Sequence, residues 1–388
     1  MADTGTGADT GVTQAADPGP PAAEPPDIHE IDLDLLRHIE AELSSQLDRR
    51  HGEAAEIDPA FAAATEALRG FVLGGGKRIR PTFAWWGWRG AGGDPADATT
   101  PAVLRALSAL ELIQACALIH DDLIDASTTR RGRPTVHVAF ADRHTQAGWA
   151  GRPARFGAAA AILLGDLALA WADDMLRDAG LPAAALLRAA EPWRAMRTEL
   201  LGGQYLDVLG QASADTSIHG ALQIDRFKTA AYTVERPLHL GAAIADAPPA
   251  LVRSYRRFGA DIGIAFQLRD DLLDVFGDPT VTGKAAGDDL REGKRTLLIA
   301  LALERAEERG ATAARTVLTE ALGDRDLDSA AVDRVRTVLC ELGAPQAVEQ
   351  RIAALTGSAL DALTVAGAAE PAASKLAELA IAATRRRS

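Results

Sequence analysis

Apolar residues recur at helical spacing along almost the whole chain. From residue 31 onward the sequence is rich in Ala, Leu, Arg and Glu at helical intervals, and alternating β-branched residues bounded by hairpin turns are nearly absent. Gly and Pro interrupt this pattern often enough to divide it into about ten helices or more. We find no fixed-period repeat and no clear linker between two halves. The sequence therefore predicts an all-α fold, with a single large helical domain over residues 28–388.

The length and composition of the chain bound the kind of protein it can be. With 388 residues, of which 47% are hydrophobic, it can bury a substantial core. Residues 1–27 are dominated by Ala, Gly, Pro, Thr and Asp, without the apolar run of a signal peptide, so we expect a disordered tail. The most apolar later run, Phe156 to Ala172, is short for a membrane span and contains Asp166. We expect a buried core helix there and no stable membrane insertion.

The net charge and the cysteines exclude several classes of function. A formal net charge of -13 repels nucleic acid and anionic membrane surfaces, so we expect no nucleic-acid partner. Any phosphate-bearing ligand must then be held by a local basic cluster. The two cysteines, Cys116 and Cys340, show no CxxC or Cys/His spacing. This usage fits a reducing, cytoplasmic location and carries no zinc signature.

Two apolar segments end in the same acidic pattern, DDxxD. The first runs from about residue 102 to 125, and the second from Asp261 to Pro279. The carboxylates are Asp121, Asp122 and Asp125 in the first segment and Asp270, Asp271 and Asp274 in the second. At about 100° per residue, positions i and i+4 share a helix face and i+1 lies beside them, so each cluster points toward one region.

Carboxylates at a helix C-terminus are unfavourable unless a cation compensates, because the negative end of the helix dipole lies there. Clustered oxygen ligands suit hard ions, and Mg²⁺ prefers a few carboxylates with water or substrate phosphate in its other positions. A single cluster would more simply be a solvated helix end. Two such clusters, each after a buried helix, favour a divalent metal site.

Basic residues near flexible backbone supply the complementary charge. The stretch GGGKRIRP, residues 74–81, joins a glycine turn to Lys77, Arg78 and Arg80, and Arg130 and Arg131 follow the first acidic cluster. Guanidinium and ammonium groups in such places suit phosphate oxygens. Neither GGGKRIRP nor the later GDPTVTGKA has the spacing and the Ser or Thr of a P-loop, so we exclude a P-loop NTPase.

Several pieces of the sequence together resemble one family, the trans-isoprenyl diphosphate synthases or polyprenyl synthetases, and among them bacterial geranylgeranyl diphosphate synthases. The pieces, in the family's order, are GGGKRIRP, HDDLIDASTTRRGRPTVH, GDLALAWADDML, GGQYLDV, FKTAAYTVERP, FQLRDDLLDVFGD and TGKAAGDDLREGKRT. They cover roughly residues 35 to 300. The resemblance implies an all-α fold around a deep central cavity, with the two acidic motifs facing each other across its mouth.

The resemblance also implies roles for individual residues. The six motif aspartates would hold Mg²⁺, about three ions per active site with Mn²⁺ as a substitute, and these ions bind the diphosphate of an allylic substrate. Arg130, Lys228, Lys284 and Lys294 would contact or close over the same diphosphate. Lys77, Arg80, Arg131 and Gln114 would bind isopentenyl diphosphate; many bacterial members have His in place of Gln114, and both side chains can donate a hydrogen bond. Lys228, Thr229, Gln267 and Arg130 would lie at the reacting groups.

The expected reaction joins isopentenyl diphosphate to an allylic diphosphate by ionisation, condensation and loss of a proton. The hydrocarbon product should run along the first helix beneath Asp121. Cys116 and Ala117 lie one turn earlier, with Ile113 deeper. In family members that stop at fifteen carbons, one or both of the positions matching 116 and 117 is typically aromatic, so the resemblance implies that small residues here allow a twenty-carbon product, geranylgeranyl diphosphate. Fifteen-carbon and twenty-five-carbon or longer products remain alternatives, as does simple helix packing for Cys116 and Ala117.

Three other functions deserve comparison. Terpene cyclases share the fold, but their second metal motif needs an asparagine, and this sequence contains none. An HD-type metal phosphohydrolase is suggested by His120 beside Asp121, yet His51 and His137 lack the expected context. A non-catalytic partner subunit would be expected to have lost metal ligands, whereas both clusters are complete. We expect a homodimer, and we expect Asp173 and Asp174 to pair with neighbouring helices rather than bind metal.

Overall fold

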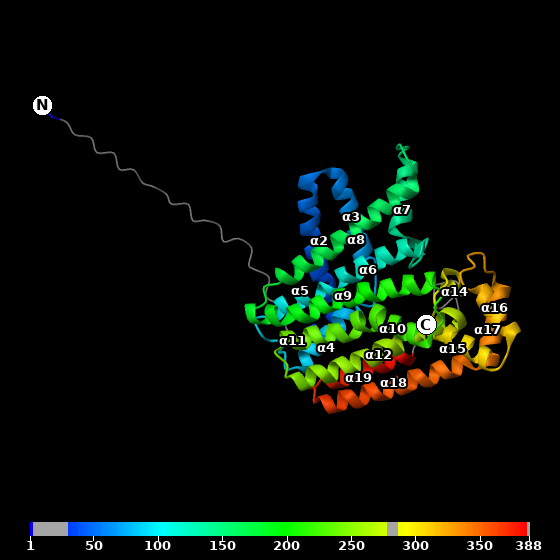
Figure 1. Ribbon diagram of the computed structural model, residues 1–388. Helices are drawn as coiled ribbons and strands as arrows, with labels where there is room; N and C mark the ends of the chain where they lie inside the picture. Colours follow the sequence, from blue (N-terminus) through cyan, green and yellow to red (C-terminus); the bar gives the residue numbers. More distant parts are fainter. Residues whose placement is uncertain (3–29, 278–285, 386–388) are drawn as a thin grey trace.

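The computed structural model describes residues 1–2, 30–277 and 286–385, and helices make up most of this part of the chain (Figure 1). Lys284, and all but the first two residues of the predicted tail at 1–27, lie outside the described residues. The helices up to the end of the first acidic motif are α1 (Glu30–Leu33), α2 (Leu35–Ile57), α3 (Pro59–Leu73), α4 (Ile79–Gly90), α5 (Thr100–Ser108) and α6 (Leu110–Ile124). The predicted all-α class is confirmed.

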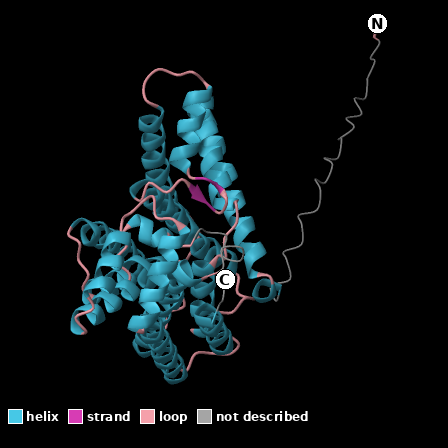
Figure 2. Cartoon of the chain, turned by 90° about the vertical axis from the view of Figure 1, so that its right-hand side faces the viewer, coloured by secondary structure: helices cyan, strands magenta, loops and turns pink. Residues whose placement is uncertain are grey.

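A short hairpin and the central helices follow. The hairpin pairs β1 (Thr129–Arg130) with β2 (Arg133–Pro134) in antiparallel register, and Figure 2 shows it as the magenta segment. Its two turn residues, Arg131 and Gly132, have φ of 53° and 70°, as a two-residue hairpin turn requires. The next helices are α7 (Val136–Gln146), α8 (Pro153–Arg177), α9 (Ala183–Ala212), α10 (Ile218–Ile224), the π-helix η1 (Asp225–Glu235), α11 (Arg236–Ile244) and α12 (Pro249–Phe276).

The C-terminal part consists of α14 (Asp288–Glu292), α15 (Leu297–Glu308), α16 (Thr312–Ala321), α17 (Ser329–Leu342), α18 (Ala344–Ala366) and α19 (Ala372–Arg385). Local sequence explains several of these boundaries. Asp58 caps α3 by accepting from the Ala60 amide at 2.6 Å, and Asp328 caps α17 by accepting from the Ala331 amide at 2.7 Å. Gly343, at φ 72°, ends α17 in the left-handed conformation that favours glycine.

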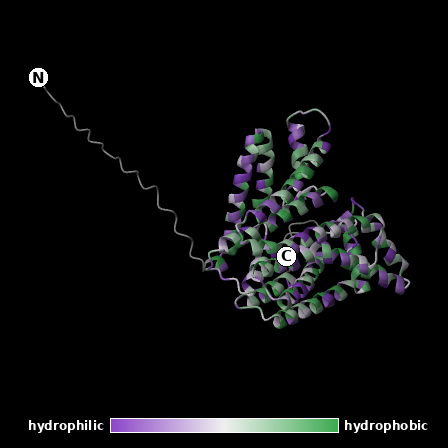
Figure 3. Cartoon of the chain, turned by 60° about the vertical axis from the view of Figure 1, so that its left-hand side comes forward, coloured by the Kyte–Doolittle hydropathy of each residue, from purple (hydrophilic) through white to green (hydrophobic). Residues whose placement is uncertain are grey.

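The core lies between helices that cross the body side by side. In Figure 1, α9, α12 and α18 run across the molecule, and Figure 3 shows that α2–α3 and α7–α8 project from one side of it. The largest wholly buried side chains include Trp85, Tyr255 and Phe258. Trp86 and Trp88 are also buried, so the tryptophans of α4 belong to the core.

Two sequence predictions about helices need correction. The apolar segment from about residue 102 to 125 is two helices, α5 and α6, which meet at Ala109. Ser108 donates its hydroxyl to the Leu104 carbonyl oxygen at 2.8 Å, and such a bond to the preceding turn bends a helix. The run in α8 is not wholly buried, since Leu163 is 68% exposed. An apolar pattern cannot separate a buried helix from one that has an uncovered apolar face.

Within the described part of the chain, two segments are long and apolar enough to cross a membrane by length and composition. They are Thr100–Ile124, whose most apolar window is 72% buried in the fold, and Pro153–Arg177, whose window is 39% buried. The first has the burial of a core helix. The second is α8, which keeps apolar side chains exposed on the surface of the single chain.

Candidate active site

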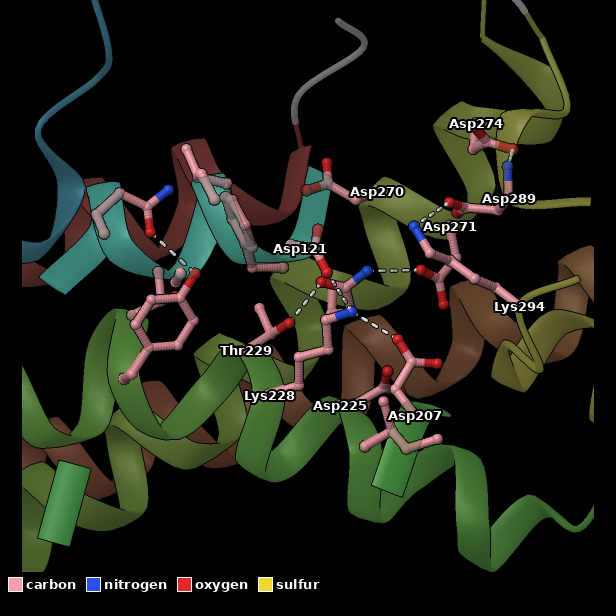
Figure 4. A pocket seen from close by; sticks show the side chains of 18 of the residues that line it. Asp121, Asp207, Asp225, Lys228, Thr229, Asp270, Asp271, Asp274, Asp289 and Lys294 are labelled. Atoms are coloured by element: carbon pink, nitrogen blue, oxygen red, sulfur yellow. Dashed lines mark hydrogen bonds and ion pairs between the residues drawn. The ribbon is translucent and has the colours of Figure 1, made fainter. Parts of the chain in front are cut away.

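A cavity of about 590 Å³ opens between the C-terminal ends of α6 and α12. Its wall takes residues from the GGGKRIRP stretch, α6, the β1–β2 hairpin, α9, α10, η1, α12 and the segment from 286 to 296. Asp121 of the first acidic motif and Asp270, Asp271 and Asp274 of the second all line it. Figure 4 shows these carboxylates pointing into one space. The structure thus brings the two motifs together.

The first motif divides its carboxylates between the cavity and the protein interior. Asp121 accepts hydrogen bonds from Lys228 Nζ at 3.0 Å and Gln204 Nε2 at 3.1 Å. Burial disfavours the charged form of Asp121, but Lys228, Lys294 and Arg130 outweigh it and hold its pKa below the usual value. Behind it, the buried Asp122 pairs with Arg130 at 2.7 Å.

Burial and neighbouring carboxylates make the charged forms of Asp125, in the first motif, and Asp271, in the second, unfavourable. Burial, with Asp121 and Glu292 nearby, raises the pKa of Asp125 to about 6, against the opposing effects of Lys294 and Lys228. Burial also raises the pKa of Asp271 well above its ordinary value, with Asp225, Asp289 and Asp274 adding to it. Asp271 Oδ2 has no hydrogen-bond partner within the described parts of the chain. A bound cation would reverse these shifts.

These oxygens fit a hard divalent ion. No three His, Cys, Asp or Glu side chains of the described residues already converge as a complete metal site. Mg²⁺ does not need one, because it binds through one or two carboxylates and takes its other ligands from water and substrate phosphate. An unpartnered buried carboxylate oxygen and two oxygen-only motifs on one cavity match that preference. Asp121, Asp270, Asp271 and Asp274 are the residues placed to hold it.

The cations of the site are paired with its carboxylates. Lys228 Nζ lies between Asp121 and Asp207, 3.0 Å and 2.5 Å away. Burial opposes its charge, but these two carboxylates outweigh that effect and raise the pKa of Lys228. Lys294 Nζ lies 3.4 Å from Asp125 Oδ2, at the other side of the cavity. Lys228 and Lys294 are therefore each held by carboxylates at the cavity.

Two glycines allow α9 and α12 to pack closely against the π-helix η1. A Cβ on Gly203 of α9 would stand 2.1 Å from the main-chain nitrogen of Lys228, and one on Gly263 of α12 would stand 2.4 Å from Ala230 Cα. Only glycine permits such close packing against η1. Within η1, Thr229 donates to Gln267 Oε1 at 2.8 Å, and Gln267 in turn donates to Asp271 at 2.8 Å. The three predicted residues Lys228, Thr229 and Gln267 thus meet on one wall.

A cluster of cations lies where α4 meets η1, and we call it the cationic wall. Arg78, buried at the start of α4 with φ 47°, donates to Glu111 at 2.9 Å. The Arg80 guanidinium lies 4.0 Å from the centre of the Tyr232 ring and donates to Thr233 at 2.9 Å. Its Nε has no hydrogen-bond partner among the described residues. This wall presents buried, partly unsatisfied donors to the cavity, as an anion site requires.

The remaining predicted residues of this wall are Gln114, Lys77 and Arg131, and all three line the cavity. Gln114 accepts from the Tyr232 hydroxyl at 2.9 Å through Oε1, which leaves its amide nitrogen to donate. Arg131 donates to the Gly75 carbonyl oxygen, so the hairpin turn rests on the glycine turn. Burial, with Arg78 and Arg130 nearby, lowers the pKa of Arg131. A ligand with negative charge would relieve this repulsion.

The structure separates the three residues predicted to limit product length. Gln114, Ala117, Leu118 and Asp121 share the cavity face of α6. Cys116 and Ile113 are buried but are not among the described residues that line the cavity. The Cys116 sulfur lies 3.7 Å from His120 Nδ1, and burial raises the pKa of its thiol to about 12. Ala117 is therefore the residue of the three that faces the cavity.

The structure also adds residues that the motifs did not single out. Asp207 and Gln204 come from the segment GGQYLDV, and Asp289 and Glu292 from the segment DDLREGK. The sequence could not reveal that Asp207 meets Lys228, because 21 positions separate them. Asp173 bonds Trp193 and Arg197, and Asp174 bonds Arg50, so this pair makes structural contacts as expected.

The chain matches known proteins over most of its length. The family model for polyprenyl synthetase matches residues 62–339. A geranylgeranyl diphosphate synthase of Mycobacterium tuberculosis is 32% identical over 297 residues, which are 72% of this chain and 78% of that protein. A farnesyl diphosphate synthase of Geobacillus stearothermophilus is 34% identical over 311 residues, 78% of this chain and 93% of that protein.

A solved structure is similar over nearly the whole fold. Geranylgeranyl pyrophosphate synthase from Corynebacterium glutamicum, complexed with isoprenyl diphosphate and magnesium, superposes with a TM-score of 0.86 at 48% sequence identity. The match covers 90% of this chain and 98% of that chain. With the family match, the paired acidic motifs and the cationic wall across one cavity, the chain belongs to the polyprenyl synthetase family.

Proposed function

We propose that this polyprenyl synthetase is a Mg²⁺-dependent prenyltransferase that condenses isopentenyl diphosphate with an allylic diphosphate to give all-trans geranylgeranyl diphosphate. The allylic substrate would be dimethylallyl, geranyl or farnesyl diphosphate. The observation that carries the proposal is a single cavity lined both by the acidic helix ends and by the arginines of the cationic wall. Two diphosphates can be held there in different ways, one by metal and lysine and one by arginine and lysine.

The allylic diphosphate would lie at the acidic motifs. Mg²⁺ held by Asp121, Asp270, Asp271 and Asp274 would neutralise negative charge on the departing pyrophosphate. Lys228 and Arg130 would exchange part of their contact with Asp121 and Asp122 for phosphate oxygens. Lys294, on the other side of the cavity mouth, would do the same with its contact to Asp125. The proposal keeps Mn²⁺ as a substitute ion and about three ions per site.

The isopentenyl diphosphate would be held by Arg80, Lys77, Arg131 and Gln114 at the cationic wall. When the allylic C–O bond breaks, its electron pair leaves with pyrophosphate and an allylic cation remains. The isopentenyl double bond attacks that cation, a new C–C bond forms, and a proton passes to the pyrophosphate. The oxygen dipoles of Thr229 and Gln267 would stabilise the cation. Holding both substrates in register supplies much of the rate enhancement.

Product length would be set by the wall of α6 below Asp121. Ala117, a small side chain on that wall, leaves room for the growing chain, and Leu118 and Leu200 line the cavity with it. This arrangement supports a twenty-carbon product over a fifteen-carbon one. A longer product, of twenty-five carbons or more, would require the chain to pass Leu200.

The assembly we propose is a homodimer in the cytoplasm. Apolar side chains remain exposed on α8 and α9; they are Ile162, Leu163, Leu201, Tyr205 and Leu209. An apolar surface of this kind favours association with a second copy through a two-fold interface.

A product assay tests the proposed function. The protein is incubated with Mg²⁺, isopentenyl diphosphate and each of the three short allylic diphosphates, and the chain length of the product is measured. We expect accumulation at twenty carbons and release of one pyrophosphate for each condensation. Release of inorganic phosphate without chain growth would instead favour a phosphohydrolase. Absence of any product with a wild-type fold would favour a non-catalytic subunit.

A further inference from the structure

The segment that contains α14 connects the two acidic motifs across the mouth of the cavity. On one side, the amides of Gly287 and Asp289 donate to the main-chain and side-chain oxygens of Asp274, at 2.9 Å and 3.2 Å. On the other side, Lys294 reaches Asp125 at 3.4 Å. One short stretch of chain therefore touches both helices that carry the motifs.

Glu292, at the end of α14, holds this connection together. Its Oε2 lies 2.6 Å from Lys294 Nζ, and its Oε1 accepts a hydrogen bond from Ser127 Oγ at 3.0 Å. Ser127 follows the first acidic motif by two residues. Both oxygens of one carboxylate are thus used, one on the lysine and one on the loop after α6.

The backbone between Glu292 and Lys294 makes this contact possible. Gly293 has φ 78°, which turns the chain so that the side chains on either side of it can meet. The same glycine packs against Gly323, whose Cα would be 3.3 Å from a Cβ at position 293. The conformation and packing of Gly293 therefore hold Glu292 and Lys294 in contact. We call the contact of Glu292 with Lys294 and Ser127 the tether.

Three carboxylates surround the Lys294 ammonium, and they differ in what else they can do. Asp289 lies 3.3 Å away and lines the cavity, and Asp125 belongs to the first acidic motif. Lys294 and Asp289 line the cavity together with Ala286, Arg295 and Thr296, whereas Glu292 is not among the described residues that line it. An anion that enters the cavity can replace Asp289 at the lysine. Glu292 can keep its contact while the lysine turns its other protons toward the ligand.

We propose that Glu292 is a positioning residue, which acts through Lys294 to aim its ammonium at the allylic diphosphate and is itself fixed by Ser127. This inference rests on the proposed function for the identity of the ligand. A lysine that is already held loses less side-chain freedom on binding than a free one. The charge-assisted bond to Glu292 also keeps the ammonium at the mouth instead of in solvent.

A double-mutant cycle on the full-length protein tests the tether. The probe is dimethylallyl S-thiolodiphosphate, an unreactive allylic analogue, and its Kd is measured with Mg²⁺ by calorimetry for wild type, Glu292→Gln, Lys294→Gln and the double variant. We expect Glu292→Gln to raise the Kd about tenfold, which corresponds to about 1.4 kcal/mol. In the Lys294→Gln background the same change should have no further effect, because Glu292 acts through the lysine. Ser127→Ala should raise the Kd by a smaller factor of about three.

Two further measurements separate positioning from general damage. The KM for isopentenyl diphosphate should stay within twofold of wild type in Glu292→Gln, since that substrate binds at the cationic wall. Glu308→Gln, an exposed charge change on α15, is the matched control and should leave both constants unchanged. An equal loss for both substrates, an unchanged Kd in Glu292→Gln, or the same loss with Lys294 already replaced would each overturn the inference. If the wild-type protein bound no allylic analogue, the proposed function would fail instead. The Kd of the same four proteins would then be measured for inorganic pyrophosphate in the presence of Mg²⁺.

Discussion

The ammonium of Lys228 lies 3.0 Å from Asp121 Oδ1, and this ion pair joins the π-helix η1 to the end of α6 at the wall of the cavity. The lysine also contacts Asp207, so it is held from both sides. A cation fixed in this way needs little reorganisation when negative charge develops on a leaving group.

We predict that Lys228→Met lowers kcat for chain elongation by about 10²- to 10³-fold, the loss typical of one preorganised electrostatic group. The KM for isopentenyl diphosphate should change little. Steady-state kinetics with both substrates varied measures this effect. Lys375→Met, on the surface of α19, is the matched control and should be indistinguishable from wild type. A Lys228 variant with normal kcat would remove this residue from the proposed mechanism.

The two candidate chain-length residues should now behave differently. Ala117→Phe puts an aromatic ring on the cavity face of α6 and should shift the product from twenty carbons to fifteen. Cys116→Phe points toward His120, so it should leave product length unchanged. It should instead overpack a buried position and destabilise the fold by about 1–3 kcal/mol. Chromatography of the products and thermal unfolding separate the two outcomes, and shortening by Cys116→Phe alone would reverse the assignment.

The exposed face of α8 predicts an effect on assembly. Leu163 is 68% exposed in the single chain, and the adjacent Ile162 of α8 is 49% exposed. Leu163→Glu should therefore give a monomer in analytical ultracentrifugation, because it would place a charge inside the apolar interface. Val365→Glu, at an apolar position of α18 that is 82% exposed, should leave the oligomeric state as in wild type. A dimer in both variants would mean that the interface lies elsewhere.

Asp225 predicts a pH dependence of stability in the ligand-free protein. Burial and the nearby Asp207 raise its pKa to about 8 from the ordinary value of 3.8. Between these values the folded state holds a proton that the unfolded state releases, so the free energy of unfolding falls as pH rises. One such group contributes a slope of up to about 1.4 kcal/mol per pH unit. Asp225→Asn should flatten the curve between about pH 4 and pH 8 and raise the Tm most at pH 8. Thermal unfolding in the presence of a chelator measures this, and parallel curves for variant and wild type would contradict it.

The sequence predicted the parts of the site that depend on local pattern. The helix ends that carry Asp121 and Asp270 follow from apolar runs, and the family resemblance added Lys228, Thr229 and Gln267, which the structure places on one wall. Side-chain direction was harder to predict. Cys116 and Ala117 are neighbours in sequence, but the rotation of α6 sends one toward α8 and the other into the cavity.

The partners of the charged residues could not be predicted, because they depend on tertiary packing. Asp207 meets Lys228 only because Gly203 allows α9 to touch η1. Glu292 meets Ser127 across 165 positions of sequence. The exposed face of α8 is a similar case, since its apolar residues are as suitable for a core as for an interface.

Carboxylates from both motifs acting on one diphosphate are the central claim, and a single kinetic comparison tests it. We would measure condensation of farnesyl diphosphate with isopentenyl diphosphate as a function of Mg²⁺ concentration in Asp121→Asn and Asp270→Asn, with the exposed Asp361→Asn as the control. We predict that each motif variant loses at least about 10²-fold in kcat and needs more Mg²⁺ for half-maximal rate, while Asp361→Asn matches wild type. Unchanged turnover and unchanged Mg²⁺ dependence in either motif variant would contradict the claim.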